Sequence, residues 1–514
     1  MGVKHLKVFG ILSGTISAII APTFSMACIS DNILAKTNIS EVQTYFSSKV
    51  REQIYQEVQS NEILKDYILN NKIIQITTAG KVTDNSFNQM TWEAISEFSR
   101  NVGFNLDMSS YKETKSMSTN EIHQAYSDAL NKQYKIWVLT GWQHSSFFQS
   151  WIQIPVYRQK FKEQNIKIIS IDWDATQISE LDPGTCISLN FRTQESSFLI
   201  GYAISQYLNE KYPDDETKKI INTTAGTDTA GSTNFCYGFL EGIRAWNKEQ
   251  TDETKKIFSN VYKADSKVFL ETTYEPNNPL TRNEFTLSIT GQGKEIFKEQ
   301  APTIVMPVAA DWSNTAANII KETNKLDQQW VVGVDSNMAI SYGPTYAPYF
   351  ITSSEKRIGI ATYKALCFLL GISQTLSLPE LYPNSNETNW IINLESKKIE
   401  QNSVESNMIV NGGIELGFVG ASPSTLSNKE DAKRFDAIIK ETKNKFFGEN
   451  SSENLLNTVD QALLAKYNEV KLSNNIAEYN LAVFNLANVL YGEMNANNKE
   501  YFNLVVSEIN KRGN

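Results

Sequence analysis

The chain has 514 residues, of which 41% are hydrophobic and 20% are charged, so it is long enough for two or three domains and too apolar for wholesale disorder. Its 48 Lys and Arg stand against 57 Asp and Glu, and the resulting net charge of −9 argues against a protein that binds nucleic acid. Four cysteines without a CxxC pair and three histidines without an HExxH motif argue against a disulfide scaffold and against a zinc site. We therefore expect neither a metal nor a cofactor.

The N-terminus predicts an exported protein with a lipid anchor. Two lysines precede an uncharged stretch at 8–24, which is typical of a secretory signal and short for a membrane-spanning helix. Residues 25–28 read Ser-Met-Ala-Cys, which resembles a bacterial lipoprotein signal. We expect 1–27 to be a signal peptide and Cys28 to carry the acyl chains that hold the protein on the extracellular face of the cell membrane. An uncleaved anchor, or an ordinary signal with an incidental cysteine, is the alternative.

Behind residues 28–71, which we interpret as a tether with one helix, β-rich runs alternate with helical patterns. Seven runs predict strands: 72–78, 134–140, 166–172, 218–224, 303–309, 330–335 and 414–419. Six patterns predict helices: 89–101, 119–132, 196–212, 234–247, 314–325 and 357–371. This alternation predicts an α/β protein of two lobes, each a mostly parallel, doubly wound sheet. The charged, amphipathic tail at 425–514 predicts a helical C-terminal extension, which we interpret as structural rather than as a docking module.

A polar loop after the first predicted strand is the strongest candidate for a binding site. In open α/β folds, ligands bind at the carboxyl ends of strands, where helix N-termini offer free amides. Asp84 in this loop is also a good helix cap, and Phe87 is either a plug beneath the loop or a platform for stacking. The same arrangement recurs after the strand at 218–224 and leads to Phe235. Two aromatic rings on facing lobes would sandwich a planar ligand.

Other polar residues follow strand ends. Asp335 ends the strand WVVGVD, where a carboxylate accepts two hydrogen bonds from a ribose or another sugar diol, unless it is only solvated or caps a helix. Asp172 and Asp174 flank a tryptophan, and we interpret them as structural or hinge residues. His144 has no paired nucleophile, so we interpret it as a loop or capping residue. Because GxSxG, P-loop and GxGxxG motifs are absent, we expect no catalytic residue and no enzyme.

Together these motifs resemble the basic membrane protein family of substrate-binding lipoproteins, whose members bind nucleosides and serve ABC importers. The loop at 84–89 reads D-N-S-F-N-Q, and 191–202 reads F-R-T-Q-E-S-S-F-L-I-G-Y. F-C-Y-G-F at 235–239 and V-G-V-D at 332–335 follow in order, so the resemblance covers about 72–424.

The resemblance implies six ligand-binding residues: Asp84, Phe87, Asn88, Phe235, Asp335 and Lys356. In such proteins the two phenylalanines sandwich a nucleobase, and the asparagine hydrogen-bonds the ligand. The first aspartate contacts the ligand or orders its loop, the second grips ribose hydroxyls, and the lysine adds a polar contact. One departure is the segment 307–312, which reads P-V-A-A-D-W where the family has P-V-A-G-G.

The resemblance also implies a type I periplasmic-binding-protein-like fold. We expect one lobe at 72–188 and 339–390, the other at 189–338 and 391–424, and a hinge of three crossovers beside a ligand cleft. The expected function is to capture a nucleoside, of purine type, and to deliver it to an ABC permease and its ATPase. A sugar-binding lipoprotein of the same fold, or a surface lipoprotein or adhesin that has lost small-molecule binding, is the alternative.

Overall fold

The computed structural model describes the body of the chain. The described residues are 42, 48–78, 80–84, 86–104, 109–215, 218–225, 230–259, 302–308, 310–372, 391–393, 398–400, 407–414 and 417–447. The expected signal peptide, Cys28 and the tail beyond 447 lie outside these residues, so what the sequence predicts for them stays a prediction. Within the described ranges, no helix is long and apolar enough to cross a membrane.

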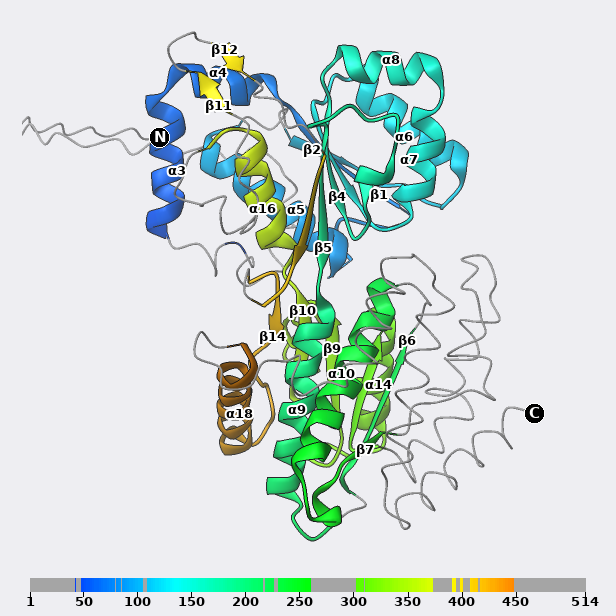
Figure 1. The fold of residues 1–514 in the computed structure, drawn as a ribbon, viewed down its shortest axis with the longest axis vertical. Coiled ribbons are helices and arrows are strands. Elements are labelled where there is room, and N and C mark those ends of the chain that lie inside the picture. Colours follow the sequence, from blue (N-terminus) through cyan, green and yellow to red (C-terminus); the bar gives the residue numbers. More distant parts are fainter. Residues whose placement is uncertain are drawn as a thin grey trace, which may run out of the picture. The chain divides into compact units, whose positions relative to one another are not determined.

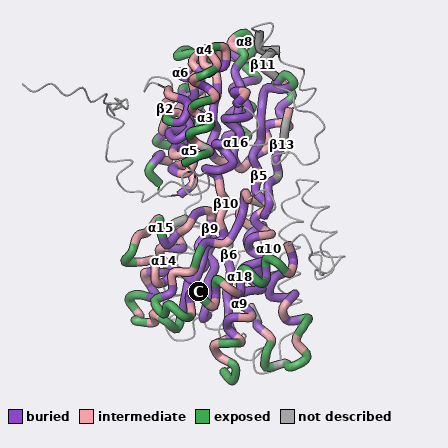
Figure 2. The backbone as a smooth tube through the Cα atoms, turned by 90° about the vertical axis from the view of Figure 1, so that its left-hand side faces the viewer, coloured by how far each residue is buried: buried purple, intermediate pink, exposed green. Residues whose placement is uncertain are grey.

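The first sheet contains six parallel strands in the order β13-β5-β4-β3-β1-β2 (Figure 1). They are β1 (Ile73–Thr77), β2 (Ser109–Lys112), β3 (Ile136–Thr140), β4 (Lys167–Ile171), β5 (Cys186–Phe191) and β13 (Met408–Gly412). Strands β1, β3 and β4 are buried at every position, and Figure 2 shows that the neighbouring strand β5 is also mostly buried. A parallel sheet covered by helices on both faces has this property, which explains why these strands read as continuous, largely apolar runs.

Helices cover both faces of the first sheet (Figure 1). One face carries α6 (Thr119–Asn131), α7 (His144–Ile152) and α8 (Pro155–Glu163). On the other side lie α3 (Ser48–Ser60), α4 (Glu62–Asn70), α5 (Phe87–Val102) and α16 (Ile358–Leu369). Aromatic side chains fill the core under α6 and α7, where Trp137 stacks on Tyr126 and meets Phe148 edge-on. This first lobe therefore has a hydrophobic core of its own.

The second sheet repeats the plan in the order β14-β10-β9-β8-β6-β7, with β14 antiparallel to β10 and the other pairs parallel. Its strands are β6 (Ile220–Ala225), β7 (Phe258–Ser259), β8 (Ile304–Val308), β9 (Trp330–Asp335), β10 (Phe350–Lys356) and β14 (Val419–Ala421). One face packs against α9 (Thr193–Lys211), α10 (Ala230–Glu249) and α18 (Lys429–Phe447), and the other against α14 (Ala310–Glu322) and α15 (Met338–Ser341). The remaining described elements are the antiparallel pair β11 (Ile391–Asn393) and β12 (Lys398–Glu400) and the 3₁₀ helices Ala175–Gln177, Glu253–Lys255 and Ala347–Tyr349.

Both sheets have a strand order that creates a topological switch point. In the first sheet β1 lies between β2 and β3, and in the second β6 lies between β7 and β8. In such open sheets ligands bind outside the carboxyl ends of the strands at this point. The predicted fold class, two mostly parallel α/β lobes of the type I periplasmic-binding-protein-like kind, is confirmed.

Three crossovers join the lobes, and they differ in position from the expected boundaries. The chain leaves the first sheet at Arg192, returns at Arg357, and leaves again between β13 and β14 at 413–418. Strand β10 belongs to the second sheet, although the expected boundary at 338/339 assigns it to the first lobe. Strand β13 belongs to the first sheet, although the expected boundary at 390/391 assigns it to the second lobe. Of the expected strand at 414–419, Val419 begins β14, whereas the described residues Ile414, Gly417 and Phe418 lie in the crossover between β13 and β14. Composition does not change where a strand passes from one sheet to another, so the sequence carries no signal for these positions.

The helices at both ends of the described chain are parts of the lobes. Ile54 and Val58 of α3 are buried, and Arg51 forms an ion pair of 2.9 Å with Glu97 of α5, so α3 packs on the first lobe instead of serving as a free tether. Phe435 and Ile438 of α18 belong to the core of the second lobe. The expected extension at 425–514 thus begins with a helix that completes this core.

Candidate functional site

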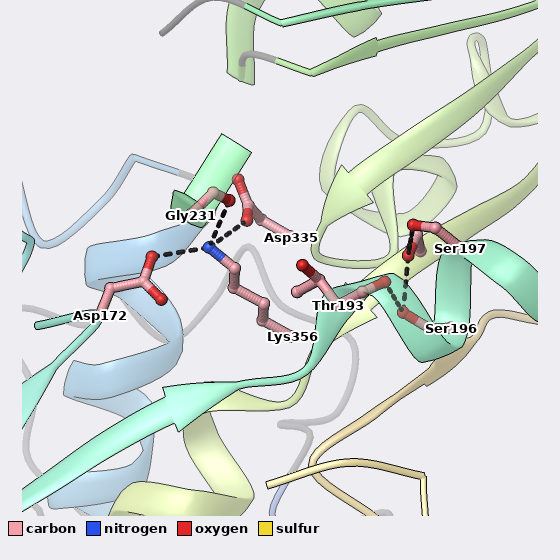
Figure 3. A network of polar contacts seen from close by, with 8 residues as sticks. Asp172, Thr193, Ser196, Ser197, Gly231, Asp335 and Lys356 are labelled. Carbon is pink, nitrogen blue, oxygen red and sulfur yellow. Dashed lines mark hydrogen bonds and ion pairs between the residues drawn. The ribbon is translucent and has the colours of Figure 1, made fainter. Parts of the chain in front are cut away.

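Lys356 is the centre of a polar cluster that joins the two lobes (Figure 3). Its Nζ lies 2.6 Å from Oδ2 of Asp172, which follows β4 in the first lobe, and 3.3 Å from Oδ1 of Asp335 at the end of β9 in the second. It also donates to the carbonyl oxygen of Gly231, near the start of α10, over 3.4 Å. Lys356 thus donates hydrogen bonds to Asp172 and Gly231 and forms an ion pair with Asp335. We call this cluster the Asp172–Lys356–Asp335 bridge.

Local backbone geometry places both carboxylates. Asp172 and Asp335 adopt positive φ values of 67° and 66°, the left-handed conformation that aspartate tolerates better than most residues. The strand end that carries Lys356 is fixed from the other side by hydroxyl groups. Ser196 and Ser197 lie near the start of α9 (Figure 3). They hydrogen-bond Oγ of Ser354 over 2.8 and 3.0 Å. Both lobes thus present an acidic strand end to one lysine.

The two expected stacking residues, Phe87 and Phe235, both lie near the same ammonium. The Nζ of Lys356 lies 5.7 Å from the ring centroid of Phe87 and 5.3 Å from that of Phe235, within the range of cation–π attraction. Phe87 is partly exposed at the start of α5, whereas Phe235 is buried in the core of the second lobe. The structure therefore brings the two phenylalanines together, with an accessible ring in the first lobe and a packed ring in the second.

The charge balance of the bridge is unequal, with one ammonium beside two carboxylates. Burial by itself would lower the pKa of Lys356, but the two carboxylates outweigh this effect and raise the pKa above its ordinary value. Burial raises the pKa of Asp172, and the Lys356 ammonium opposes that rise. The lysine consequently stays charged, and one carboxylate remains in surplus for a hydrogen-bond donor on a ligand.

Asp84 orders the loop that carries Phe87. Its Oδ1 accepts hydrogen bonds from the backbone N–H groups of Ser86 (2.9 Å) and Gln89 (3.1 Å), and its Oδ2 accepts one from that of Asn88 (3.0 Å). These N–H groups belong to the N-cap Ser86 and to the first turn of α5. They have no partner within the helix, and the helix dipole favours a negative charge there. Of the two roles expected for Asp84, the ordering role is the one its contacts display.

Asn88 is held against the backbone of the same loop. Gln75 of β1, which is fully buried, donates to the carbonyl oxygen of Asn88 over 3.0 Å. A Cβ atom at Gly80 would lie 2.5 Å from Nδ2 of Asn88, so glycine is needed there for the asparagine to keep its position. The loop thereby fixes Asn88 next to Phe87, and the expected hydrogen bond from Asn88 to a ligand stays a prediction.

His144 is a structural residue. Its side chain is completely buried, its Nε2 lies 2.9 Å from the carbonyl oxygen of Ile76, and its Nδ1 lies 2.6 Å from the hydroxyl of Tyr126. Because Nε2 faces an acceptor, it carries the proton and Nδ1 accepts from the tyrosine. Burial lowers the pKa of His144 to about 3, so the ring is neutral at physiological pH. Among the described residues no cluster of His, Cys, Asp or Glu is suited to hold a metal ion.

Asp172 is the member of the site that sequence reasoning missed. We interpreted it as a structural or hinge residue, whereas its carboxylate makes the shortest contact that Lys356 has in the bridge. The signal was present, because Asp172 follows a strand of the first sheet just as Asp335 ends a strand of the second.

Comparison with solved structures gives matches of low sequence identity. A solute-binding protein of an ABC transporter system from Aeropyrum pernix K1 is 17% identical, with a TM-score of 0.46 over 86% of this chain and 98% of that one. The arabinose-binding protein AraP from Geobacillus stearothermophilus is 9% identical, with a TM-score of 0.43 over 71% and 99%. A transcriptional activator of the comK gene from Bacillus halodurans is 11% identical, with a TM-score of 0.44 over 73% and 97%.

Comparison with protein families is more specific. A search against curated proteins gave no match. The model of the Bmp family, described as ABC transporter substrate-binding protein, PnrA-like, matches residues 71–264. This segment contains the first lobe up to β5, the loop with Asp84 and Phe87, and α10 with Phe235. Residues 71–264 are thus similar to the Bmp family of ABC transporter substrate-binding proteins, the family that the motifs resemble.

Proposed function

We propose that the protein captures a nucleoside, of purine type, between its two lobes and delivers it to an ABC permease. The observation that carries the proposal is the convergence of Phe87 and Phe235 with two strand-end carboxylates on one point. An aromatic ring is a platform for a nucleobase, and a carboxylate accepts the hydroxyl protons of a ribose. Asp335 is assigned to the ribose, and Asn88 to a polar edge of the base.

Asp84 and Lys356 complete the proposed site. Asp84 acts by holding Phe87 and Asn88 in place through the three backbone hydrogen bonds of its carboxylate. Lys356 supplies a charged donor to the ligand and links the two carboxylates. Because the contacts come from both lobes, a ligand would bind the closed form more tightly than an open one, which is the differential affinity that shifts a conformational equilibrium.

The cellular location that we propose for the protein rests on its N-terminal segment, which resembles a lipoprotein signal. Acylation of Cys28 would place the protein on the extracellular face of the cell membrane, and two acyl chains anchor stably where a single chain does not. The closed, loaded form would then be recognised by a membrane permease that is driven by an ATPase. The protein itself breaks no bond in this role.

A sugar is the second candidate ligand, and the burial of Phe235 favours it. A ring with 1% exposure has little free face for stacking, which leaves Phe87 and the polar groups of the bridge. A single aromatic face with carboxylates beside it also suits a sugar ring, so the ligand class has to be decided by experiment.

Thermal-shift titration of the full-length chain in detergent decides it. Nucleosides, free bases, ribose and common sugars are compared, because a ligand that binds the folded state stabilises it by about 2.7 kcal/mol at a hundredfold excess over Kd. We expect a rise in Tm with nucleosides alone, lost in Phe87→Ala and Asp335→Asn and kept in Phe147→Ala, which changes a partly buried ring on α7 outside the site. A rise with sugars alone would establish the second candidate, and no rise with any of them would refute both.

A further inference from the structure

We propose that the Asp172–Lys356–Asp335 bridge is a latch, which holds the two lobes together while no ligand is bound. The lysine ammonium stands in for the ligand at the point where both lobes present their polar groups. The inference takes from the proposed function only the location of the site, and its test uses no ligand.

The latch follows from how the three charges are divided between the lobes. Lys356 and Asp335 belong to the second sheet, and Asp172 belongs to the first. The contact of 2.6 Å between Lys356 and Asp172 must therefore break when the lobes separate, whereas the contact with Asp335 persists. Because the lysine keeps one carboxylate partner in the open form, opening leaves no unpaired buried ammonium. The bridge can open and close reversibly for this reason.

The position of the ammonium makes it an internal substitute for a ligand. It lies within 6 Å of the rings of Phe87 and Phe235, one from each lobe, and its side chain is only 4% exposed. A planar ligand that stacks on Phe87 needs the space over that ring. Entry of the ligand therefore requires the lysine to move away from the ring of Phe87, and the hydrogen bonds of the ligand replace those of the latch.

The latch has a consequence for affinity. The apparent affinity of a ligand falls by the fraction of protein whose site is accessible. A closed, ligand-free form held by an ion pair lowers this fraction. The contact is largely shielded from solvent, with side-chain exposures of 4% for Lys356 and 14% for Asp172, so mobile salt screens it less than it screens a surface pair.

Pulsed electron paramagnetic resonance on the ligand-free, full-length chain tests the proposal. Spin labels are attached at Lys132→Cys in the first lobe and Lys433→Cys in the second, because both positions are exposed. Cys186, Cys236 and Cys367 are buried and do not compete for the label, and Cys28 is replaced by serine in every labelled variant. In the otherwise unchanged protein we expect one short inter-lobe distance. In Asp172→Asn, and separately in Lys356→Met, we expect a second, longer distance to appear.

Asp174→Asn is the matched control. It makes the same chemical change two residues away, on a carboxylate that caps the 3₁₀ helix Ala175–Gln177 and takes no part in the bridge. We expect it to keep the short distance, and the double variant Asp172→Asn with Lys356→Met to open no further than the single ones. The latch is refuted if the two single variants keep the short distance while circular dichroism shows them folded, or if the protein with an intact bridge is already as open as the variants.

Discussion

At the scale of single residues, the environment of a side chain decides its role more than its type does. Asp172 and Asp174 are two residues apart, yet one contacts Lys356 and the other caps a short helix. The position of His144 after β3 is typical of a binding residue. Its ring is nevertheless buried and hydrogen-bonded to the carbonyl oxygen of Ile76 and the hydroxyl of Tyr126. Residues that follow a strand end lie near the site because of their position on the chain. Their burial and their contacts then decide whether they can bind a ligand or only support the fold.

The burial of His144 predicts an acid-sensitive stability. Its pKa of about 3 in the folded chain lies below the value of about 6.5 in an unfolded chain. The unfolded state therefore binds more protons between these values, and the free energy of unfolding falls by about 1 kcal/mol per unit as the pH drops from 6.5 towards 3. We expect His144→Gln to remove this part of the slope in urea unfolding measured at pH 7.5, 6.5 and 5.5.

Tyr126→Phe is the control for His144. It removes the hydroxyl that donates to Nδ1 but leaves the ring buried, so the protein should lose stability at every pH and keep the slope. An unchanged slope in His144→Gln would contradict the assignment of this histidine as a buried, neutral residue.

At the scale of elements, the glycines of the family-like motifs serve helix packing. Gly201 of α9 and Gly238 and Gly242 of α10 lie where the two helices touch, and a Cβ atom at any of them would overlap backbone atoms of the other helix. The motifs at 191–202 and 235–239 thus specify a close approach of α9 and α10. The contact between the two helices fixes the position of Phe235 on α10 and of the start of α9.

We expect Gly238→Ala to destabilise the protein by about 1–3 kcal/mol, because a methyl group there collides with the backbone oxygen of Gln194 and forces the helices apart. Equilibrium urea unfolding measures the loss. Lys248→Ala, at an exposed position of the same helix, should change stability by no more than about 0.5 kcal/mol. Equal stability of the two variants would show that the close approach is not required.

At the scale of the whole molecule, two hydrophobic cores are linked by three crossovers that share backbone hydrogen bonds. The N–H of Arg192 donates to the carbonyl of Gly412, and the N–H of Arg357 donates to that of Phe418, each over 2.8 Å. The first two crossovers are therefore each bonded to the third. Helix α18 adds the last described part of the chain to the second core, through Phe435 and its neighbours.

The place of α18 in this core predicts a large effect from a residue far from the site. Phe435 is completely buried, and we expect Phe435→Ala to lower the free energy of unfolding by about 3–5 kcal/mol. The adjacent Arg434 pairs with Glu210 at the surface, with both side chains about 40% exposed, so Arg434→Ala should cost less than about 1 kcal/mol. Urea unfolding of both variants checks this, and a small effect of Phe435→Ala would mean that α18 is an appendage.

Much of the fold was predictable, because strand and helix propensity and hydrophobic period are local properties of the chain. The predicted helices at 89–101 and 119–132 match α5 and α6 closely, and the strand at 330–335 matches β9. The strands β10 and β13 were not predicted. Each lies next to a crossover and pairs with a strand far away in the sequence: Ser354 of β10 pairs with Ala421, and Met408 of β13 pairs with Ile187.

By itself, the sequence determined the α/β class, the polar loop with Asp84 and Phe87 between a strand and a helix, and the acidic strand end at Asp335. These are encoded by residues close together along the chain. Tertiary structure alone decided that Asp172 and Lys356 form an ion pair, that Phe235 is buried, and that His144 is a neutral core residue. The reason is that burial and charge pairing depend on which strand ends meet, and Asp172 and Lys356, 184 residues apart, are brought together only when both sheets have formed.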